Sequence, residues 1–508
     1  MAGQVYVRRD IWSLEAQQPW HPIVDAYAQA VDAMRRRDPQ EPTSWAYQAE
    51  VHSTRGPAPD NFRNQCQHGS WFFLPWHRMY LYWFEQIVRE LVRTLPGIPD
   101  AVRDTWALPY WDYGRRGPAT DGRYRMLPPS FRRRTTPSGD PNPLFVPQRD
   151  RVLNAGGRMP ELATSPDAAL RDTDFSVDPQ PGGTVGFGGP VTSWHHAPPS
   201  PSGSLEVTPH GAVHSLVGGP GGFMSAFDTA PLDPIFWLHH ANIDRLWVVW
   251  LRQTRPERQN PTETAWTGFE FDFHDETGAP VDPRPTPLHV LDTVADLGYR
   301  YQRTTPPPAP RIPQGVTSVT SQPPPPGLAH PPELVGASER PVQLTGRPTR
   351  VAMSVAEPTG PVRHTMAAPD RPNRVYLNVE GIEGESNPGT VYAVYIDLPD
   401  DDDEDTDPET HYVGTINFFG IEAAGDVDRD HSAEPGLRFA FDVTELVEEL
   451  RDQGIWDPSQ VTVTFAPLQP SPPPGGPALA AADVAAADEE PAEPPPPVRV
   501  GRISVYYQ

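Results

Sequence analysis

Histidines gather in two sets along this 508-residue chain, and their spacing limits what the chain can fold into more than any other feature. The first set is His52, His68 and His77, and the second is His210 and His214 followed by the adjacent pair His239 and His240. Three imidazoles reach one metal ion only if helices and loops bring them together. The fold is therefore expected to place helices around two neighbouring metal positions.

The first set lies in a segment that favours a helix after a loop. His68 and His77 are separated by Pro75, and apolar residues dominate from Trp71 through Phe84. Proline is tolerated in the first turn of a helix and not in its interior, so we expect a helix to begin near Pro75. Taken singly, each of these histidines could equally be a hydrogen-bonded core residue.

The second set combines an i, i+4 pair with a later helix. His210 and His214 fall on one side of a helix, within reach of a single ion. Adjacent residues on a helix diverge by about 100°, so only one of His239 and His240 can face the same ion. Asn242, Asp244 and Arg245 follow, and these polar groups are candidates to orient the ligands.

The ligand types favour copper. Imidazole suits zinc, copper, iron and nickel, whereas magnesium, calcium and manganese prefer oxygen ligands. A dizinc hydrolase usually has bridging carboxylates, and a di-iron bundle has Glu-x-x-His motifs. Neither occurs at these positions. Two copper ions are therefore the predicted cofactor.

Two runs resemble the type-3 copper family of tyrosinases, catechol oxidases and haemocyanins. They are HGSWFFLPWHRMYLYWFE, from His68, and DPIFWLHHANIDRLW, from Asp233. The resemblance covers nearly the whole chain and makes His240 the metal ligand and His239 its neighbour. It implies a mainly helical dicopper domain with a four-helix-bundle core, in an α+β multidomain chain. It also implies dioxygen bound between the coppers and electrons taken from a phenolic ring.

The resemblance implies roles for further residues around the two ions. Family members with a Cys-x-His arrangement carry a thioether bond, which predicts a crosslink between Cys66 and His68. In plant members a glutamate four residues before the first ligand of the second copper holds a water that helps deprotonate the phenol. Glu206 stands at that offset from His210.

The positions after two of the ligands bear on substrate choice. Gly211 stands where enzymes that hydroxylate monophenols often have asparagine, and Ser215 follows His214. Without a side chain at 211 water activation is expected to be weaker, which favours oxidation of diphenols. After a glycine-rich loop, Phe223 or Met224 is expected to cover the substrate entrance.

Charge and composition exclude several partners. Acidic residues exceed basic ones by 66 to 41, a net charge of −25, which argues against nucleic acid and anionic membranes. The single cysteine excludes an intramolecular disulfide. No apolar run resembles a secretory signal or a membrane span, so cytoplasmic residence is the expectation. The acidic run 400–407 and the pair His195 and His196 are expected to be exposed loop residues.

Four parts are expected along the chain. Residues 1–258 form the dicopper domain, and 259–303 a small segment packed on it. In that segment Tyr299 and Tyr301 resemble the paired tyrosines of plant polyphenol oxidases, with Arg8 or Arg9 as a cation–π partner. Residues 304–336 are a proline-rich linker, and 337–508 a C-terminal antiparallel barrel or sandwich with one helix near 443–451.

The tail resembles the C-terminal domain that covers the copper site of plant polyphenol oxidases. It is therefore predicted to shield the site until the linker is cut, which would make the chain a latent o-diphenol oxidase. The alternatives are a tyrosinase with monophenol hydroxylase activity, an o-aminophenol oxidase, a haemocyanin-like oxygen-binding protein and a zinc-binding structural protein. The sequence leaves the oligomeric state open.

Overall fold

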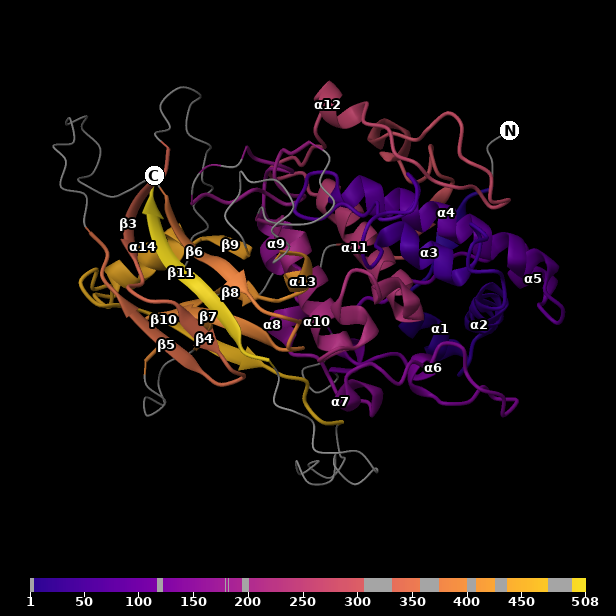
Figure 1. Ribbon diagram of the computed structural model, residues 1–508, viewed down its shortest axis with the longest axis horizontal. Helices are drawn as coiled ribbons and strands as arrows, with labels where there is room; N and C mark the ends of the chain where they lie inside the picture. The colour runs from indigo at the N-terminus through magenta and orange to yellow at the C-terminus, as the bar shows by residue number, and fades with distance from the viewer. Residues whose placement is uncertain are drawn as a thin grey trace.

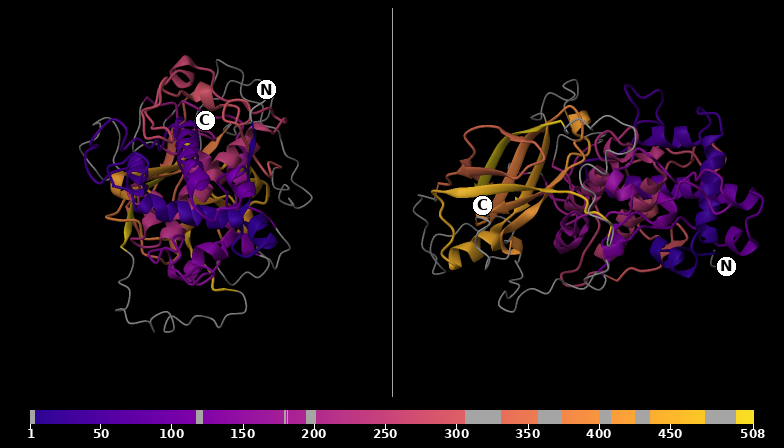
Figure 2. Two further views of the ribbon diagram at one scale, coloured as in Figure 1. Left: turned by 90° about the vertical axis from the view of Figure 1, so that its right-hand side faces the viewer. Right: turned by 90° about the horizontal axis from the view of Figure 1, so that it is seen from below.

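The computed structural model divides the chain into a helical lobe and a β lobe that lie against each other (Figure 1). It describes residues 4–116, 122–178, 180, 182–193, 201–305, 331–356, 374–399, 408–424, 436–473 and 496–508. His195, His196, most of the proline-rich linker and the acidic run 400–407 lie outside these residues. Figure 2 shows the same two lobes from two further directions. The expected architecture, a helical copper domain followed by an antiparallel β domain, is confirmed.

Long buried helices build the helical lobe. The principal ones are α2 (Pro22–Arg35), α3 (Trp45–His52), α4 (Phe73–Thr94), α10 (Ala212–Gly218) and α11 (Pro234–Leu251). Shorter helices are α1 (Ile11–Gln17), α5 (Asp100–Arg103), α6 (Pro129–Arg132), α7 (Arg151–Asn154), α8 (Glu161–Thr164), α9 (Asp167–Arg171) and α12 (Thr264–Thr267). These elements share one large apolar core that is rich in tryptophan and phenylalanine.

Local sequence explains where the site-bearing helices begin. Asp233 caps α11 by accepting a hydrogen bond from the Ile235 N–H, and Pro234 takes the first helical position. Ser44 caps α3 in the same way through the Tyr47 N–H. Helix α4 begins at Phe73, so Pro75 lies in its first turn, where no intrahelical donor is needed.

The N-terminus and the segment after the helices close the lobe together. Strand β1 (Tyr6–Arg8) pairs in parallel with β2 (Tyr299–Tyr301). The guanidinium carbon of Arg8 lies 3.7 Å from the ring centre of Tyr299, which confirms the predicted cation–π contact with Arg8 as the partner. This pairing fixes both ends of the helical lobe against its core.

Two antiparallel sheets build the β lobe. One sheet has the order β5-β10-β7-β8 and the other β3-β11-β6-β9, with β4 also paired to β11. Their bounds are β3 (Glu333–Ala337), β4 (Val342–Leu344), β5 (Thr349–Met353), β6 (Val375–Glu383), β7 (Val391–Ile396), β8 (Tyr412–Ile416), β9 (Leu437–Asp442), β10 (Val461–Leu468) and β11 (Val498–Tyr507). Helices α13 (Ile421–Ala424) and α14 (Thr444–Asp452) accompany them.

The two sheets share a second apolar core, which includes Val379 and Ile503 from one sheet and Val394 and Val463 from the other. Each core is built mainly within its own lobe, although Val391 of β7 packs into the first. The exception that bears on function is Phe419, which follows β8 and packs into the core of the helical lobe.

Candidate metal centre

The histidines of the two sets lie next to one another in the helical lobe, and all are buried. His52 ends α3, His77 lies in the second turn of α4, and His68 comes from the loop before α4. The centres of their rings are 5.2–5.6 Å apart. Three separate segments therefore present imidazoles to one point.

The second set converges in the same way. His210 lies two residues before α10 and His214 lies within it, one helical turn later, with ring centres 4.7 Å apart. His240, on α11, has its ring centre 5.0 Å from that of His210. The rings of His77 and His240 stack at 4.6 Å, so the two sets adjoin.

Hydrogen bonds fix which ring nitrogen carries the proton. Nδ1 of four rings lies 2.8–3.2 Å from a backbone carbonyl oxygen, and a carbonyl can only accept. The four pairs are His52 with Phe227, His77 with Phe73, His210 with Glu206 and His214 with Met224. Nδ1 therefore donates, and the lone pair is on Nε2, the atom that a metal ion would bind.

The Nε2 atoms face one another at a distance suited to a shared ion. Nε2 of His52 is 3.3 Å from that of His68, and Nε2 of His214 is 3.2 Å from that of His240. Two imidazole nitrogens about 2.0–2.1 Å from one tetrahedral ion lie about 3.3 Å apart. Nε2 of His77 and of His210 has no hydrogen-bond partner among the described residues. The His52–His68 and His214–His240 pairs therefore each fit one metal ion, and the rings of His77 and His210 have centres within 5.6 Å of the pair beside them.

Burial keeps four of these imidazoles neutral. It lowers the pKa of His77 to about 3, and it lowers the pKa of His210, His214 and His240 well below the ordinary value of histidine. Neighbouring imidazoles lower the pKa of those three further. Metal ligation requires the neutral ring, so the site is prepared for a cation before it binds.

The adjacent histidines His239 and His240 on α11 both lie beside His210 and His214. His239 Nδ1 lies 3.0 Å from the hydroxyl of Tyr113, a residue that the sequence did not single out. Its ring stacks near that of His210, and its Nε2 has no partner among the described residues. Both histidines of the pair have a nitrogen within 4.8 Å of the donors of His210 and His214, so position alone does not choose between them.

Glu206 lies between the two sets. Its Oε1 is 3.0 Å from His68 Nδ1, and both carboxylate oxygens accept from the Gly69 N–H. Burial raises the pKa of Glu206 to about 8, while hydrogen bonds from Gly69 and Ser202 oppose the rise. The contact with His68 turns that ring so that Nε2 faces His52. The expected water-holding role of Glu206 stays a prediction.

Cys66 is buried beside the first set. Its sulfur and one nitrogen each of His52 and His68 lie within 4.8 Å of one another. The family resemblance predicts a crosslink between Cys66 and His68, and the structure adds that the two side chains lie close together.

The predicted orienting groups on α11 bond elsewhere. Asn242 accepts from Arg245, which also donates to Asp112. Asp244 accepts from two arginines and two tyrosines, namely Arg8, Arg78, Tyr299 and Tyr301. These contacts tie α11 to β1, α4 and β2, so Asp244 stabilises the helix that carries His240 and does not touch the ligands.

Two aromatic rings, which the sequence alone did not indicate, cover the histidines. The Phe227 ring stacks on His68 with centres 4.2 Å apart, and the Phe419 ring stacks on His214 at 3.9 Å, both with an interplanar angle of 11°. Neither Phe223 nor Met224, the residues expected at the entrance, is among those that line the pocket. Instead, Met224 supports His214 through its carbonyl oxygen.

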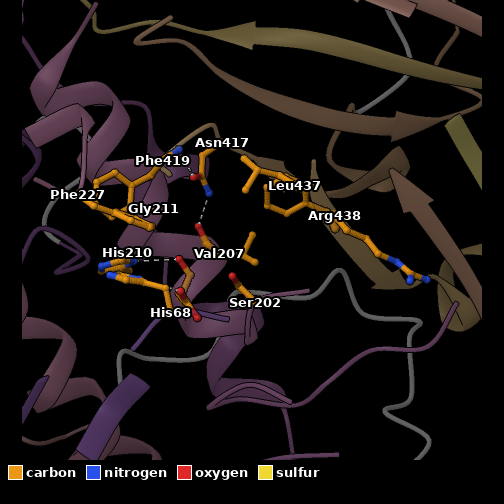
Figure 3. A pocket seen from close by; sticks show the side chains of 12 residues that line it. His68, Ser202, Val207, His210, Gly211, Phe227, Asn417, Phe419, Leu437 and Arg438 are labelled. Carbon is orange, nitrogen blue, oxygen red and sulfur yellow. Dashed lines mark hydrogen bonds and ion pairs between the residues drawn. The ribbon is translucent and has the colours of Figure 1, made fainter. Parts of the chain in front are cut away.

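The pocket above the histidines lies between the two lobes. It is lined by His68, Glu206, His210, Gly211 and Phe227 from the helical lobe, and by Asn417, Phe419 and Arg438 among others from the β lobe (Figure 3). Its cavity volume is only about 20 Å³, so its own side chains nearly fill it. The Arg438 guanidinium points away from the histidines. No local sequence signal marked Phe419 or Asn417, because they lie about 200 residues from the histidines that they cover.

Two adjoining clusters of buried histidines define a dinuclear copper centre of the type-3 class. Comparison with known protein families agrees with a copper centre of this class. The model of the common central domain of tyrosinase matches residues 42–253, and a domain of unknown function matches 331–474.

Relatives match over most of the chain. A tyrosinase of Hahella sp. (strain CCB-MM4) is 34% identical over 87% of this chain and 92% of its own length. A chloroplastic polyphenol oxidase of Malus domestica is 26% identical over 87% of this chain and 72% of its own. The structure of latent apple tyrosinase covers all of this chain and 98% of its own, with TM-score 0.59 and 21% identity.

The chain belongs to the tyrosinase family, whose members are copper oxidoreductases. At 21% identity the apple structure establishes the shared fold alone, a helical lobe followed by a β lobe. Among the described residues, no helix is long and apolar enough to cross a lipid bilayer.

Proposed function

We propose that this chain oxidises o-diphenols to o-quinones while dioxygen is reduced to water, and that its β lobe keeps it latent. The observation that carries the proposal is a pair of imidazole triads covered by the Phe419 ring of the β lobe. The ligands of the first copper are His52, His68 and His77, and those of the second are His210, His214 and His240.

Bound copper supplies the electron-accepting centre at which dioxygen and the diphenol react. The protein provides the rest. Backbone carbonyls hold four of the imidazoles with Nε2 inward, and Glu206 holds His68. A catechol ring would take the place of Phe419 against the His214 ring, since that face is already shaped for a stacked aromatic group.

Position 211 favours diphenols over monophenols. Gly211 offers no amide to hold a water beside Glu206, so deprotonation of a monophenol lacks a partner there. Monophenol hydroxylation is the second candidate, and it is favoured by the 34% identical relative, which is named a tyrosinase. An o-aminophenol oxidase would use the same centre, and a haemocyanin-like carrier would bind dioxygen without turning over phenols.

One assay separates these functions. Copper-loaded chain, cut within residues 306–330, is given catechol, tyrosine, tyramine or 2-aminophenol. Quinone formation from catechol without a lag, and none from tyrosine or tyramine, is the expected result. Steady hydroxylation of tyrosine would establish a tyrosinase instead, and turnover of 2-aminophenol above that of catechol an aminophenol oxidase. Reversible dioxygen binding with no product would indicate a carrier, and zinc without copper would contradict the proposal entirely.

Replacing Phe419 with alanine is expected to activate the intact chain. The phenyl ring contacts His214 and Phe227, and losing a buried aromatic contact costs more than about 1.4 kcal/mol, so catechol turnover should rise about tenfold or more. The control is the same substitution in cut chain, where the shield no longer acts and turnover should match that of cut wild type. Equal rates for intact wild type and intact variant would contradict shielding by this ring.

The proximity of Cys66 to His68 supports the proposed thioether. Its formation would replace one S–H and one C–H bond by a C–S bond, and the two protons and two electrons released would pass to dioxygen. The peptide that contains both residues is then lighter by two hydrogen atoms, which mass spectrometry measures after copper loading. The Cys66→Ser variant, with no sulfur, should show no such loss. An unchanged wild-type peptide mass would contradict the crosslink.

A further inference from the structure

The backbone conformation at position 211 does not require glycine. Its φ of −65° and ψ of −32° are helical values that every L residue adopts. Glycine in a helix is less stable than alanine, because it loses more conformational freedom on folding. A reason for the missing side chain must therefore come from a neighbour.

That neighbour is Asn417 of the β lobe. A Cβ atom at position 211 would lie 2.5 Å from Asn417 Oδ1 and 2.7 Å from its Nδ2, closer than real Cβ contacts. Asn417 is buried and held at both ends of its amide. Its Nδ2 donates to the Val207 carbonyl oxygen at 2.9 Å, and its Oδ1 accepts from the Phe419 N–H at 3.1 Å (Figure 3). The amide cannot turn aside without losing these bonds.

The same amide positions the ring that covers the second triad. Asn417 fixes the backbone of Phe419, and the Phe419 ring stacks on His214. Gly420 follows at a φ of +85°, and a Cβ there would run into the Phe227 ring. The segment 417–420 thus fits against the helical lobe only where residue 211 has no side chain.

We propose that Gly211 couples substrate selection to shielding. Position 211, directly after His210, can carry a side chain beside the substrate or admit the amide of Asn417, but not both. A residue larger than glycine at 211 displaces 417–420 and uncovers the site without any cleavage. This inference rests on the proposed function for its consequence in catalysis, whereas the steric conflict itself does not.

Only the segment 417–420 is expected to move, because a separate contact holds the two lobes together. Asn387 Nδ2 donates to Ser215 Oγ and to the Ser225 carbonyl oxygen, both at 3.1 Å. These bonds do not involve Gly211 or Asn417. Displacement of 417–420 therefore leaves the β lobe attached.

The test is amide hydrogen exchange of the full chain, followed in the peptide that spans 412–424. The variants are Gly211→Asn, Asn417→Gly and the double variant, with Gly211→Ala as a milder change. Gly211→Asn is expected to raise exchange in this peptide by roughly tenfold or more, as for an overpacked buried site. In the Asn417→Gly background the same substitution should add nothing, because the clash partner is gone.

Gly183→Ala is the matched control. Gly183 follows Gly182, which accepts from Asn378 of the β lobe, but a Cβ at 183 comes no closer than 3.7 Å to any neighbour. Hydrogen exchange of peptide 412–424 in the Gly183→Ala variant should equal that of wild type. Equal effects of Gly211→Asn with and without Asn417, or no effect in either, would overturn the proposal. If exchange follows the expected pattern but catechol turnover by the intact variant does not rise, the steric conflict between residue 211 and Asn417 stands and the proposed function fails.

Discussion

Alanine in place of His240 is expected to remove one of two copper ions and to lower catechol oxidation by the cut chain at least about a hundredfold. His240 Nε2 lies 3.2 Å from His214 Nε2, and a triad reduced to two imidazoles holds copper weakly. A metal ion stabilises the transition state by several kcal/mol, so losing one ion of the pair removes most of the rate. Copper content per chain and catechol turnover are the two measurements.

His239 provides the matched control on the same helix. It is as buried as His240, but its Nδ1 contacts the Tyr113 hydroxyl. The His239→Ala variant is expected to keep both copper ions. If it loses copper while His240→Ala keeps it, the assignment within the pair is reversed. Loss in neither variant would contradict the second triad.

Asparagine in place of Asp244 is expected to destabilise the helical lobe by about 3–5 kcal/mol, because it leaves buried arginines without their counter-charge. Asp244 accepts hydrogen bonds from Arg8 and Arg78, and from the hydroxyls of Tyr299 and Tyr301. Both arginines are fully buried. The melting temperature of the chain should fall by roughly 10 °C, which calorimetry measures.

An exposed ion pair is the control for Asp244. Asp32 and Arg36 pair on the surface of α2, where solvent screens the charges. The Asp32→Asn variant should therefore melt within about one degree of wild type. A similarly small change for Asp244→Asn would contradict the structural role assigned to the buried network.

The same network sets a pH dependence. Burial by itself raises the pKa of Asp244, but Arg78, Arg8 and the two tyrosines outweigh it, so the folded-state pKa lies below the ordinary value of 3.8. A carboxyl with a lowered pKa contributes its full stability above about pH 4 and loses it as pH falls through the folded-state value. The stability difference between wild type and Asp244→Asn, measured by urea unfolding, should therefore shrink only below about pH 4.

Under the proposed function, the segment 417–420 explains how one chain can combine an assembled metal centre with a closed entrance. Asn417 and Phe419 reach across from the β lobe, while Asn387 anchors that lobe beside Ser215. Under the proposed function, cutting the linker and altering residue 211 or 419 would be separate routes to the same open site. The first acts on the whole β lobe, and the second on four residues.

Local patterns in the sequence were enough to predict the helices around the site. Asp233 and Pro234 mark the start of α11, and Pro75 marks the first turn of α4, through rules that involve only neighbouring residues. In the tail, the alternating apolar runs that start at Val375, Val391, Leu437, Val461 and Val500 predict strands, and they lie in β6, β7, β9, β10 and β11. The helix predicted near 443–451 is α14. Strands β3, β4, β5 and β8 were missed, because they are short and their burial depends on which strands pair with them.

The sequence by itself determined the chemistry, because residue types and their spacing carry it: six candidate imidazoles, a nearby cysteine and glutamate, and the helices that hold them. Only the tertiary structure decided what covers the site. Phe227, Phe419 and Asn417 act through contacts across loops and between lobes, and the reason for Gly211 is a side chain more than 200 residues away. Such contacts depend on how two separate cores dock, and no local pattern encodes that.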